Sequence, residues 1–244
     1  MCDIPSAMKR NPIFMCWHDL LFAHWPIGEE QLRPHIPPQL DVDTYDGDAW
    51  IGIVPFWMSG VRHHRLPIGM TFPELNVRTY VRHQDHRGVW FFSLDAASWV
   101  TVRAARAWFG LPYFDAKISC MPDGEAIHYD SRRTHRGAPV AALKASYRPV
   151  GEAARASAGS LEEFLVERYC LFSQRRGTVL KGDICHESWA LQHAVAEFEM
   201  NTMLDGLRIE LPKRPPILHF SKFLKVETAG PAPIPLYLGH GRRE

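Results

Sequence analysis

Apolar and polar residues alternate along much of this chain, and a period of two is typical of β-strands with one covered face. The pattern predicts a hairpin over residues 40–56, with Asp46 and Gly47 supplying its turn. A second hairpin joins residues 75–83 to residues 89–96 through the polar loop QDHRG. The remaining alternating segments, all predicted strands, are short ones within 115–150 and longer ones at 191–200 and 217–227.

Helix signals are fewer than strand signals. Residues 98–109 open with a serine suited to cap a helix and stop at Gly110, which predicts a helix between them. Ser160 and Glu163 form a capping box before LEEFLVERYCLF, which predicts a helix over residues 161–172. Two short helices are predicted at 29–35 and 201–207.

Strands therefore outnumber helices, and the two types do not alternate in the strict order of a doubly wound fold. This order predicts a strand-rich α+β protein with a mainly antiparallel sheet. No composition break divides the chain, and the small residues of 151–159 are expected to form a surface loop rather than a linker. We therefore expect a single domain over residues 1–244.

One predicted strand, FPELNVRTYVRH, carries polar side chains in a row along one face. Its polar residues are Glu74, Asn76, Arg78 and Tyr80. The following strand, GVWFFSLDA, has large rings on both faces, with Trp90, Phe92 and Leu94 on one and Phe91, Ser93 and Asp95 on the other. Both of its faces are therefore expected to be covered, which favours a polar row that is at least partly enclosed.

An enclosed row would form a binding surface, because buried charges need a partner or a ligand. Arg78 would clamp an anion, and Glu74 would transfer a proton. A strand with one solvated face remains the alternative, since antiparallel sheets commonly expose one side.

Histidines are numerous, with 13 in the chain, but their spacing matches no metal template. We expect no metal site. His24 and His186 differ from the others because they lie beside tryptophans, in AHWP and ICHESWALQ. Each is either a satisfied core residue or a proton carrier that faces a cavity.

Charge and motifs exclude several classes of protein. The chain has 28 Lys and Arg against 27 Asp and Glu, so it lacks the basic excess that nucleic acids and anionic membranes require. Dinucleotide and phosphate-loop glycine motifs are missing, as is the nucleophile elbow of α/β-hydrolases. The opening MCDIPSAMKRN lacks the apolar segment of a signal peptide. The chain has five cysteines, an odd number with no C-x-x-C spacing, which favours a reducing compartment. We expect a cytoplasmic protein with no membrane span.

Seven stretches taken together resemble the YqjF-like family of uncharacterised bacterial proteins, which is grouped with the acetoacetate decarboxylase-like superfamily. They are WHDLLFAHWPI, DAWIGIVPFWM, PELNVRTYV, GVWFFSLDA, ARAWFGLPYFDAKIS, SLEEFLVERYCLF and ICHESWALQ. The resemblance implies a curved, cone-like antiparallel β-barrel with a central cavity and a few outer helices. It spans the chain from about Trp17 to Lys225.

The resemblance also shows what this chain lacks. Acetoacetate decarboxylases form a Schiff base through a lysine in the motif Gly-x-Pro-Lys-Lys, whereas here Tyr113 and Phe114 follow Gly-Leu-Pro. Lys117 lies farther along and would need a different geometry. Tyr113 is therefore expected in the cavity at the lysine's place, and the decarboxylase mechanism is not expected to carry over.

These observations lead to a cytoplasmic enzyme that acts on a carboxylate- or carbonyl-bearing metabolite by acid–base chemistry, as a lyase, isomerase or hydrolase. Its expected catalytic residues are Glu74, Arg78 and His186, and its expected substrate-binding residues are His24, Asn76, Tyr80, Tyr113 and Arg132. Arg132 is as compatible with the surface as with the pocket, and Arg168 is expected in a salt bridge on a helix surface. No cofactor is expected, and the oligomeric state stays open. A non-catalytic ligand-binding protein and a His-ligated metal enzyme remain the alternatives.

Overall fold

The computed structural model describes residues 12–234, and the opening segment MCDIPSAMKRN lies outside this range. One sheet of thirteen strands forms the described part of the molecule. Its strands are β1 (Ile13–Ile27), β2 (Asp41–Val42), β3 (Ala49–His63), β4 (Met70–His83), β5 (His86–Ala96), β6 (Tyr113–Asp123), β7 (Ala126–Arg133), β8 (Ala142–Ala154), β9 (Cys170–Arg175), β10 (Thr178–His186), β11 (Leu191–Asn201), β12 (Ile217–Thr228) and β13 (Ala232–Pro233). The helices are α1 (Glu29–Leu32), α2 (Trp99–Phe109) and α3 (Leu161–Val166), with single 3-10 turns at Arg33–His35 and Asp205–Leu207. The predicted strand-rich α+β class is confirmed.

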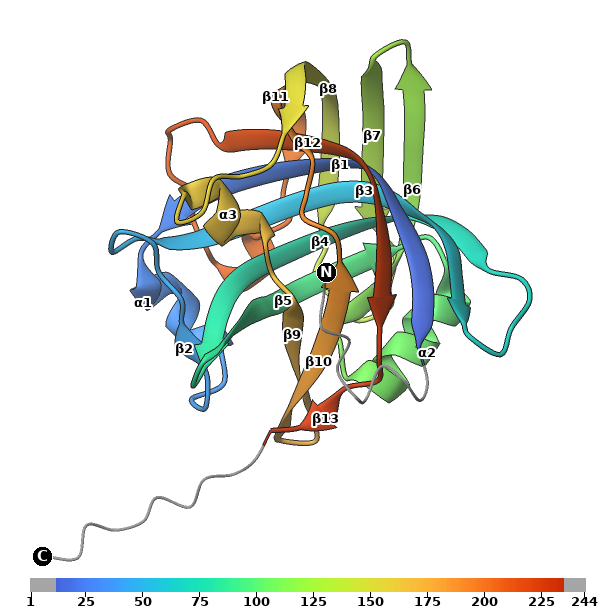
Figure 1. The fold of residues 1–244 in the computed structure, drawn as a ribbon, viewed down its shortest axis with the longest axis vertical. Coiled ribbons are helices and arrows are strands. Elements are labelled where there is room, and N and C mark those ends of the chain that lie inside the picture. The colour runs from blue at the N-terminus through green and yellow to red at the C-terminus, as the bar shows by residue number, and fades with distance from the viewer. Residues whose placement is uncertain (1–11, 235–244) are drawn as a thin grey trace, which may run out of the picture.

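The strand pairings close on themselves. β12, β1, β3, β4 and β5 are antiparallel neighbours in that order. β5 then pairs in parallel with β9, β9 pairs with β10, and β10 returns to β12. These seven strands therefore form a closed circuit. Figure 1 shows the long strands β1, β3, β4 and β5 curving side by side, with α2 and α3 at opposite ends of them.

The two faces of β4 pack into different clusters of buried side chains. Leu75, Val77 and Val81 join one cluster with residues of β7 and β8. Tyr80 joins the other with residues such as Phe22 of β1. The polar row shares this second face, and Glu74, Asn76, Arg78 and Tyr80 are all buried. The period of two in the sequence thus separates a largely apolar core from a face that carries charged and polar groups.

A bulge in β5 changes the faces that simple alternation predicts. Val77 pairs with Ser93 and Arg78 pairs with Phe91, so Phe92 has no direct partner on β4. The extra residue turns Phe91 and Leu94 to the same side, where both join the cluster that surrounds the polar row. The prediction that Leu94 shares a face with Trp90 and Phe92 is wrong for this reason.

Two of the four predicted helices differ from expectation: α3 is much shorter, and residues 201–207 contain only the 3-10 turn Asp205–Leu207 after β11 ends at Asn201. α2 is capped by Ser98, whose hydroxyl accepts a hydrogen bond from the Thr101 N–H, and Gly110 ends it in the left-handed conformation. α3 stops at Val166, although the capping box of Ser160 is in place. Cys170–Arg175 forms β9 instead, because pairing with β5 and β10 completes the circuit. Tertiary pairing overrides local helix propensity here.

Three smaller expectations also change. β2 pairs with β4, so residues 40–56 form no hairpin between β2 and β3, although Tyr45 and Asp48 bridge across the expected turn. β8 runs to Ala154, so the surface loop at 151–159 is shorter than predicted. β10 was not predicted, because TVLKGDICH has no clean alternation. Within residues 12–234, no helix has the length and apolar character that a membrane crossing requires.

Candidate functional site

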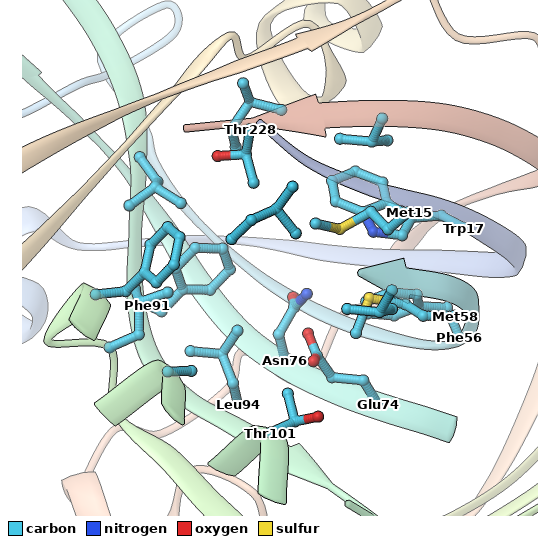
Figure 2. Close-up of a pocket in the computed structure, with 18 of the residues that line it drawn as sticks. Met15, Trp17, Phe56, Met58, Glu74, Asn76, Phe91, Leu94, Thr101 and Thr228 are labelled. Carbon is cyan, nitrogen blue, oxygen red and sulfur yellow. The ribbon is translucent and has the colours of Figure 1, made fainter. Parts of the chain in front are cut away.

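A cavity of about 270 Å³ lies inside the seven-strand circuit. Its walls come from all seven strands, from α2 and from the residues that follow α3. Most of the lining is apolar, including Leu20, Val54, Phe56, Met58 and Leu94. Figure 2 shows Glu74 and Asn76 projecting from β4 into this apolar surrounding.

Glu74 is the acidic group of the cavity. Its side chain is buried, and burial raises the pKa of its carboxyl to about 8, with a smaller contribution from the nearby charge of Asp95. The Tyr113 hydroxyl donates a hydrogen bond to Glu74 and opposes part of this rise. The second carboxyl oxygen, Oε2, has no partner. Glu74 is therefore mostly protonated at neutral pH and holds a free oxygen toward the cavity.

This pKa predicts how stability depends on pH. Because the folded-state pKa of about 8 lies above the ordinary value of 4.5, the unfolded chain binds fewer protons than the folded chain between these pH values. The free energy of unfolding therefore falls as pH rises through this window. Between pH 6 and pH 8 the wild type is expected to lose about 2 kcal/mol more than Glu74→Gln.

Urea unfolding of both proteins at the two pH values measures this difference. Glu125→Gln, in an exposed turn, serves as the matched control and is expected to follow the wild type. Equal pH dependence of the wild type and Glu74→Gln would show that Glu74 has no raised pKa.

Arg78 lies four residues after Glu74 in β4, on the same face of the strand. Its Nη2 donates to the Leu165 carbonyl at 3.4 Å, and its guanidinium lies 5.3 Å from the centre of the Phe22 ring. Its Nε has no partner, and among the described residues no carboxylate forms an ion pair with it. The cavity thus contains a buried cation whose charge is not neutralised by the protein.

Arg168 brings a second guanidinium to the same end of the cavity. Its Nη1 forms an ion pair with Asp43 at 2.6 Å, and its Nε donates to the Phe164 carbonyl. Both Arg168 and Asp43 are buried, so the expectation of a salt bridge on a helix surface is wrong. The short α3 explains the difference, because Arg168 lies after the helix ends and turns inward.

Polar atoms without partners gather around this cavity. Buried polar atoms in proteins are normally hydrogen-bonded, so such a concentration requires an explanation. Six cavity-lining atoms have no partner in the described structure: Trp17 Nε1, Glu74 Oε2, Asn76 Oδ1, Arg78 Nε, Arg168 Nη2 and Trp189 Nε1. Four of these are N–H donors, a set suited to an anionic or carbonyl oxygen.

His24 and Tyr80 lie behind the cavity wall, and neither lines it. The Tyr80 hydroxyl donates to the Leu165 carbonyl at 2.7 Å and lies 2.6 Å from His24 Nε2, which then donates to the hydroxyl oxygen. Burial, and then the charge of Arg78, lower the pKa of His24 well below 6.5, so the ring is neutral. Gly52 makes room for this ring, because a Cβ there would lie 2.8 Å from it. The Tyr80 ring lies 5.8 Å from the Arg78 guanidinium, so Tyr80 packs against Arg78 from behind the cavity wall.

His186 does line the cavity. Its Nδ1 is 2.7 Å from the Glu187 carbonyl, and its Nε2 is 3.4 Å from the Arg168 carbonyl. The ring stacks on Tyr169, and burial lowers its pKa. Both nitrogens thus face backbone oxygens, which fixes the ring beside the cavity.

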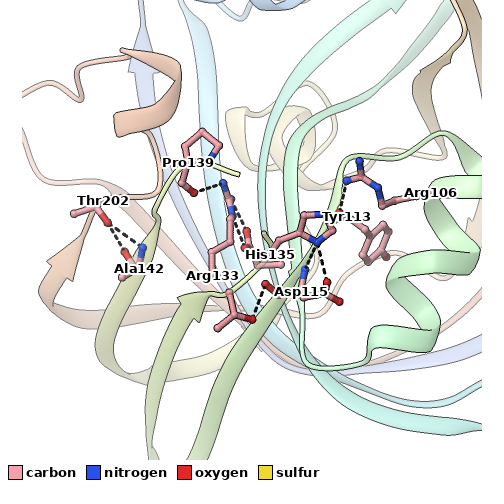
Figure 3. Close-up of polar contacts among 10 residues, drawn as sticks. Arg106, Tyr113, Asp115, Arg133, His135, Pro139, Ala142 and Thr202 are labelled. Atoms are coloured by element: carbon pink, nitrogen blue, oxygen red, sulfur yellow. Dashed lines mark hydrogen bonds and ion pairs between the residues drawn. The ribbon is translucent and has the colours of Figure 1, made fainter. Parts of the chain in front are cut away.

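Arg132 is exposed on β7 and lies outside the cavity, so the structure places it at the surface, one of the two positions that the sequence left open. The side chain of the next residue, Arg133, is only 7% exposed. It forms two hydrogen bonds with the Asp95 carboxylate, at 2.6 and 2.7 Å, in the network of Figure 3. Every second residue of β7 from the buried Ile127 onward lies on the same face, and Arg133 continues this series. The alternation in the sequence therefore already indicated that Arg133, and not Arg132, points inward.

The same network holds the chain at Tyr113 and at Asp115. Arg106 of α2 donates to the Tyr113 carbonyl at 2.7 Å (Figure 3). Asp115 contacts both Arg103 and His135. Tyr113 and Phe114 thus lie between residues of α2 and β7, since Arg106 and Arg133 both contact the Phe114 ring. Within residues 12–234, no three His, Cys, Asp or Glu side chains converge as metal ligands would.

Comparisons with known proteins agree with this geometry. The chain is 43% identical over 209 residues to "Uncharacterized protein YqjF" of Bacillus subtilis (strain 168), covering 84% of this chain and 86% of that protein. Three solved structures share the fold at low identity. The enduracididine biosynthesis enzyme MppR has a TM-score of 0.63 and 11% identity, over 95% of this chain and 91% of its own. Acetoacetate decarboxylase from Legionella pneumophila has a TM-score of 0.60 and 12% identity, over 93% and 88%. An acetoacetate decarboxylase-like enzyme from Sphingomonas wittichii RW1 has a TM-score of 0.60 and 13% identity, over 91% and 92%.

A family model settles the relationship. The DUF2071 model, described as "Uncharacterized conserved protein", matches residues 15–225, which include Glu74, Asn76, Arg78, Arg168 and His186 of the cavity. The predicted resemblance to YqjF-like proteins with an acetoacetate decarboxylase-like fold is confirmed. The chain belongs to the DUF2071 family.

Proposed function

We propose that this protein is an acid–base enzyme that acts on a small metabolite carrying a carboxylate and a carbonyl group. One observation carries the proposal. A mostly protonated carboxyl group, Glu74, and a guanidinium without a counter-charge, Arg78, share one apolar cavity. Perturbed titratable groups that converge in a cavity are typical of active sites.

Each residue has a defined role in this proposal. Arg78 binds the substrate carboxylate, and the unpartnered indole N–H groups of Trp17 and Trp189, which also line the cavity, donate to the substrate. Ionised Glu74 takes a proton from the carbon next to the carbonyl, and the electron pair of that C–H bond moves into an enolate. Glu74 then returns a proton to carbon or to oxygen. Tyr113 orients the carboxyl through its hydrogen bond.

Glu74 is a better proton carrier than His186 in this arrangement. The nitrogens of His186 both face backbone carbonyls, whereas Glu74 has an unpartnered oxygen. The pKa of about 8 places Glu74 close to neutral pH, where proton transfer in both directions is efficient.

The structural neighbours support the substrate class. One MppR structure is a complex with pyruvate, and other neighbours are acetoacetate decarboxylases, named for a small oxo-carboxylate. The chemistry must differ from a Schiff-base route, since none of the described lining residues is a lysine and Lys117 is exposed on β6. Proton transfer by Glu74 is the chemistry that the remaining residues provide.

A non-catalytic binding protein is the second candidate, and the same missing lysine favours it. Such a protein would use Arg78 and the indole donors for binding, and Glu74 would only complete the cavity wall.

Titration calorimetry with a panel of 2-oxo and 3-oxo carboxylates, paired with NMR in D₂O, tests the proposal. The wild type is expected to bind a member of the panel and to exchange the hydrogens next to its carbonyl for deuterium. Arg78→Met is expected to bind at least 30-fold more weakly, because a charged hydrogen-bonded contact is lost. Arg62→Met, at the cavity mouth, is the matched control and is expected to stay within threefold.

Three results separate the candidates. Binding without exchange or product would support the non-catalytic protein. Binding that Arg78→Met leaves unchanged would reject the anion site. No binding by any member of the panel would reject the proposed substrate class.

A further inference from the structure

The cavity opens to solvent through an apolar mouth. Leu66, Met70 and Trp108 line both the cavity and this opening, and all three are exposed. Ile68 and Trp99 extend the apolar rim outward, at 82% and 70% exposure. Isolated exposed apolar residues are ordinary, but a rim continuous with an apolar cavity indicates a binding site.

Arg78 and Arg168 lie at the other end of the cavity, whereas Arg62 lies near the mouth. The part of β4 that lines the cavity runs from Met70 to Arg78. These residues are eight positions apart, which corresponds to roughly 26 Å along the strand. Arg78 contacts the Leu165 carbonyl of α3, whereas Met70 contacts Ser98 and Thr101 at the start of α2. The cavity is thus polarised: its inner end holds the unneutralised guanidinium of Arg78, whereas the mouth, apart from Arg62 and His63, is lined by apolar side chains.

Small side chains of α2 keep the path between these ends open. Ala104 and Ala105 line the cavity on the turn of α2 that precedes Trp108. The Trp108 ring lies 6.2 Å from the His63 ring of β3, so the two rings flank the mouth. An extended apolar chain can pass Ala105 where a bulky side chain would block it.

We infer that the ligand of this cavity is a carboxylate with an aliphatic tail of about eight or more carbons, bound with its carboxylate at Arg78 and its tail directed toward Leu66 and Trp108. This inference rests on the proposed function, because it uses the same anion site. It adds the substrate class, which is an acid with an acyl chain or the oxo derivative of such an acid. A short metabolite would leave the apolar part of the cavity unfilled. Glu74 then faces the chain at a position between its two ends.

Binding of butyrate, octanoate and dodecanoate, each below its micelle-forming concentration, tests the inference. Affinity is expected to rise by about fourfold for each added methylene that is buried, so octanoate binds at least 100-fold more tightly than butyrate. Tryptophan fluorescence reports binding, because Trp17, Trp108 and Trp189 all line the cavity.

Variants at the two ends separate the tail from the head group. Ala105→Trp is expected to weaken dodecanoate binding at least 30-fold and to leave butyrate binding within threefold. Arg78→Met is expected to weaken all three acids at least 30-fold, whereas Arg62→Met, near the mouth, stays within threefold. Ala107→Trp, on the exposed face of α2 and outside the lining, controls for general damage to the helix.

Other outcomes contradict the inference in distinguishable ways. Equal affinity for the three acids would contradict the inference of an acyl tail, as would dodecanoate binding that Ala105→Trp leaves unchanged. Neither result would contradict the anion site at Arg78. Affinity that rises with chain length but depends on Arg62 and not on Arg78 would overturn the orientation and the proposed function together.

Discussion

Glu74→Gln is expected to slow deuterium exchange next to the carbonyl of a bound oxo-carboxylate by about 10²- to 10⁴-fold, the usual contribution of a positioned acid or base. The amide keeps the size of the carboxyl and can still meet Tyr113, but it cannot accept and return a proton. Binding is therefore expected to stay within about threefold, since Arg78 holds the carboxylate. NMR in D₂O measures the exchange, and calorimetry measures the binding.

The pH dependence of the same exchange identifies the direction of proton transfer. If Glu74 acts as a base, the rate is expected to rise with pH and to level off above its pKa of about 8. A rate that falls through pH 8 assigns Glu74 as the acid instead. Glu125→Gln, exposed and remote, is expected to keep the full rate. Exchange in Glu74→Gln at more than a tenth of the wild-type rate would exclude Glu74 as the proton carrier.

Arg133→Met is expected to lower the free energy of unfolding by about 3–5 kcal/mol, because it leaves a buried carboxylate without its partner. The Asp95 side chain is 1% exposed and receives both hydrogen bonds from Arg133, at 2.6 and 2.7 Å. The Arg133 guanidinium also covers the Phe114 ring at 4.2 Å, so methionine preserves part of the packing. Urea unfolding at pH 7 gives the value.

Two further variants distinguish a lost partner from lost packing. Arg103→Met removes the exposed ion pair with Asp115 and is expected to cost less than about 1 kcal/mol. Combining Arg133→Met with Asp95→Leu removes both buried charges and is expected to recover more than half of the lost stability. A double variant as unstable as the single one would assign the effect to packing against Phe114.

The sequence alone determined the fold class and the polar face of β4. Alternation along a strand follows from backbone geometry, so the side on which Glu74 and Arg78 lie could be predicted without a structure. The absence of a lysine directly after Gly-Leu-Pro was equally visible, because Tyr113 and Phe114 follow that stretch. Capping signals likewise predicted α2 and the first turn of α3.

Only the tertiary structure decided which of these residues meet. The bulge at Phe92 depends on the register between β4 and β5, and it turns Leu94 into the cavity. Arg168 becomes a buried cavity residue because pairing of β9 between β5 and β10 ends α3 early. Register and strand order arise from contacts between distant segments, which no local pattern encodes. The residue types of the site were therefore readable from the chain, whereas its polarised shape, charged inside and apolar at the mouth, came from closing the sheet.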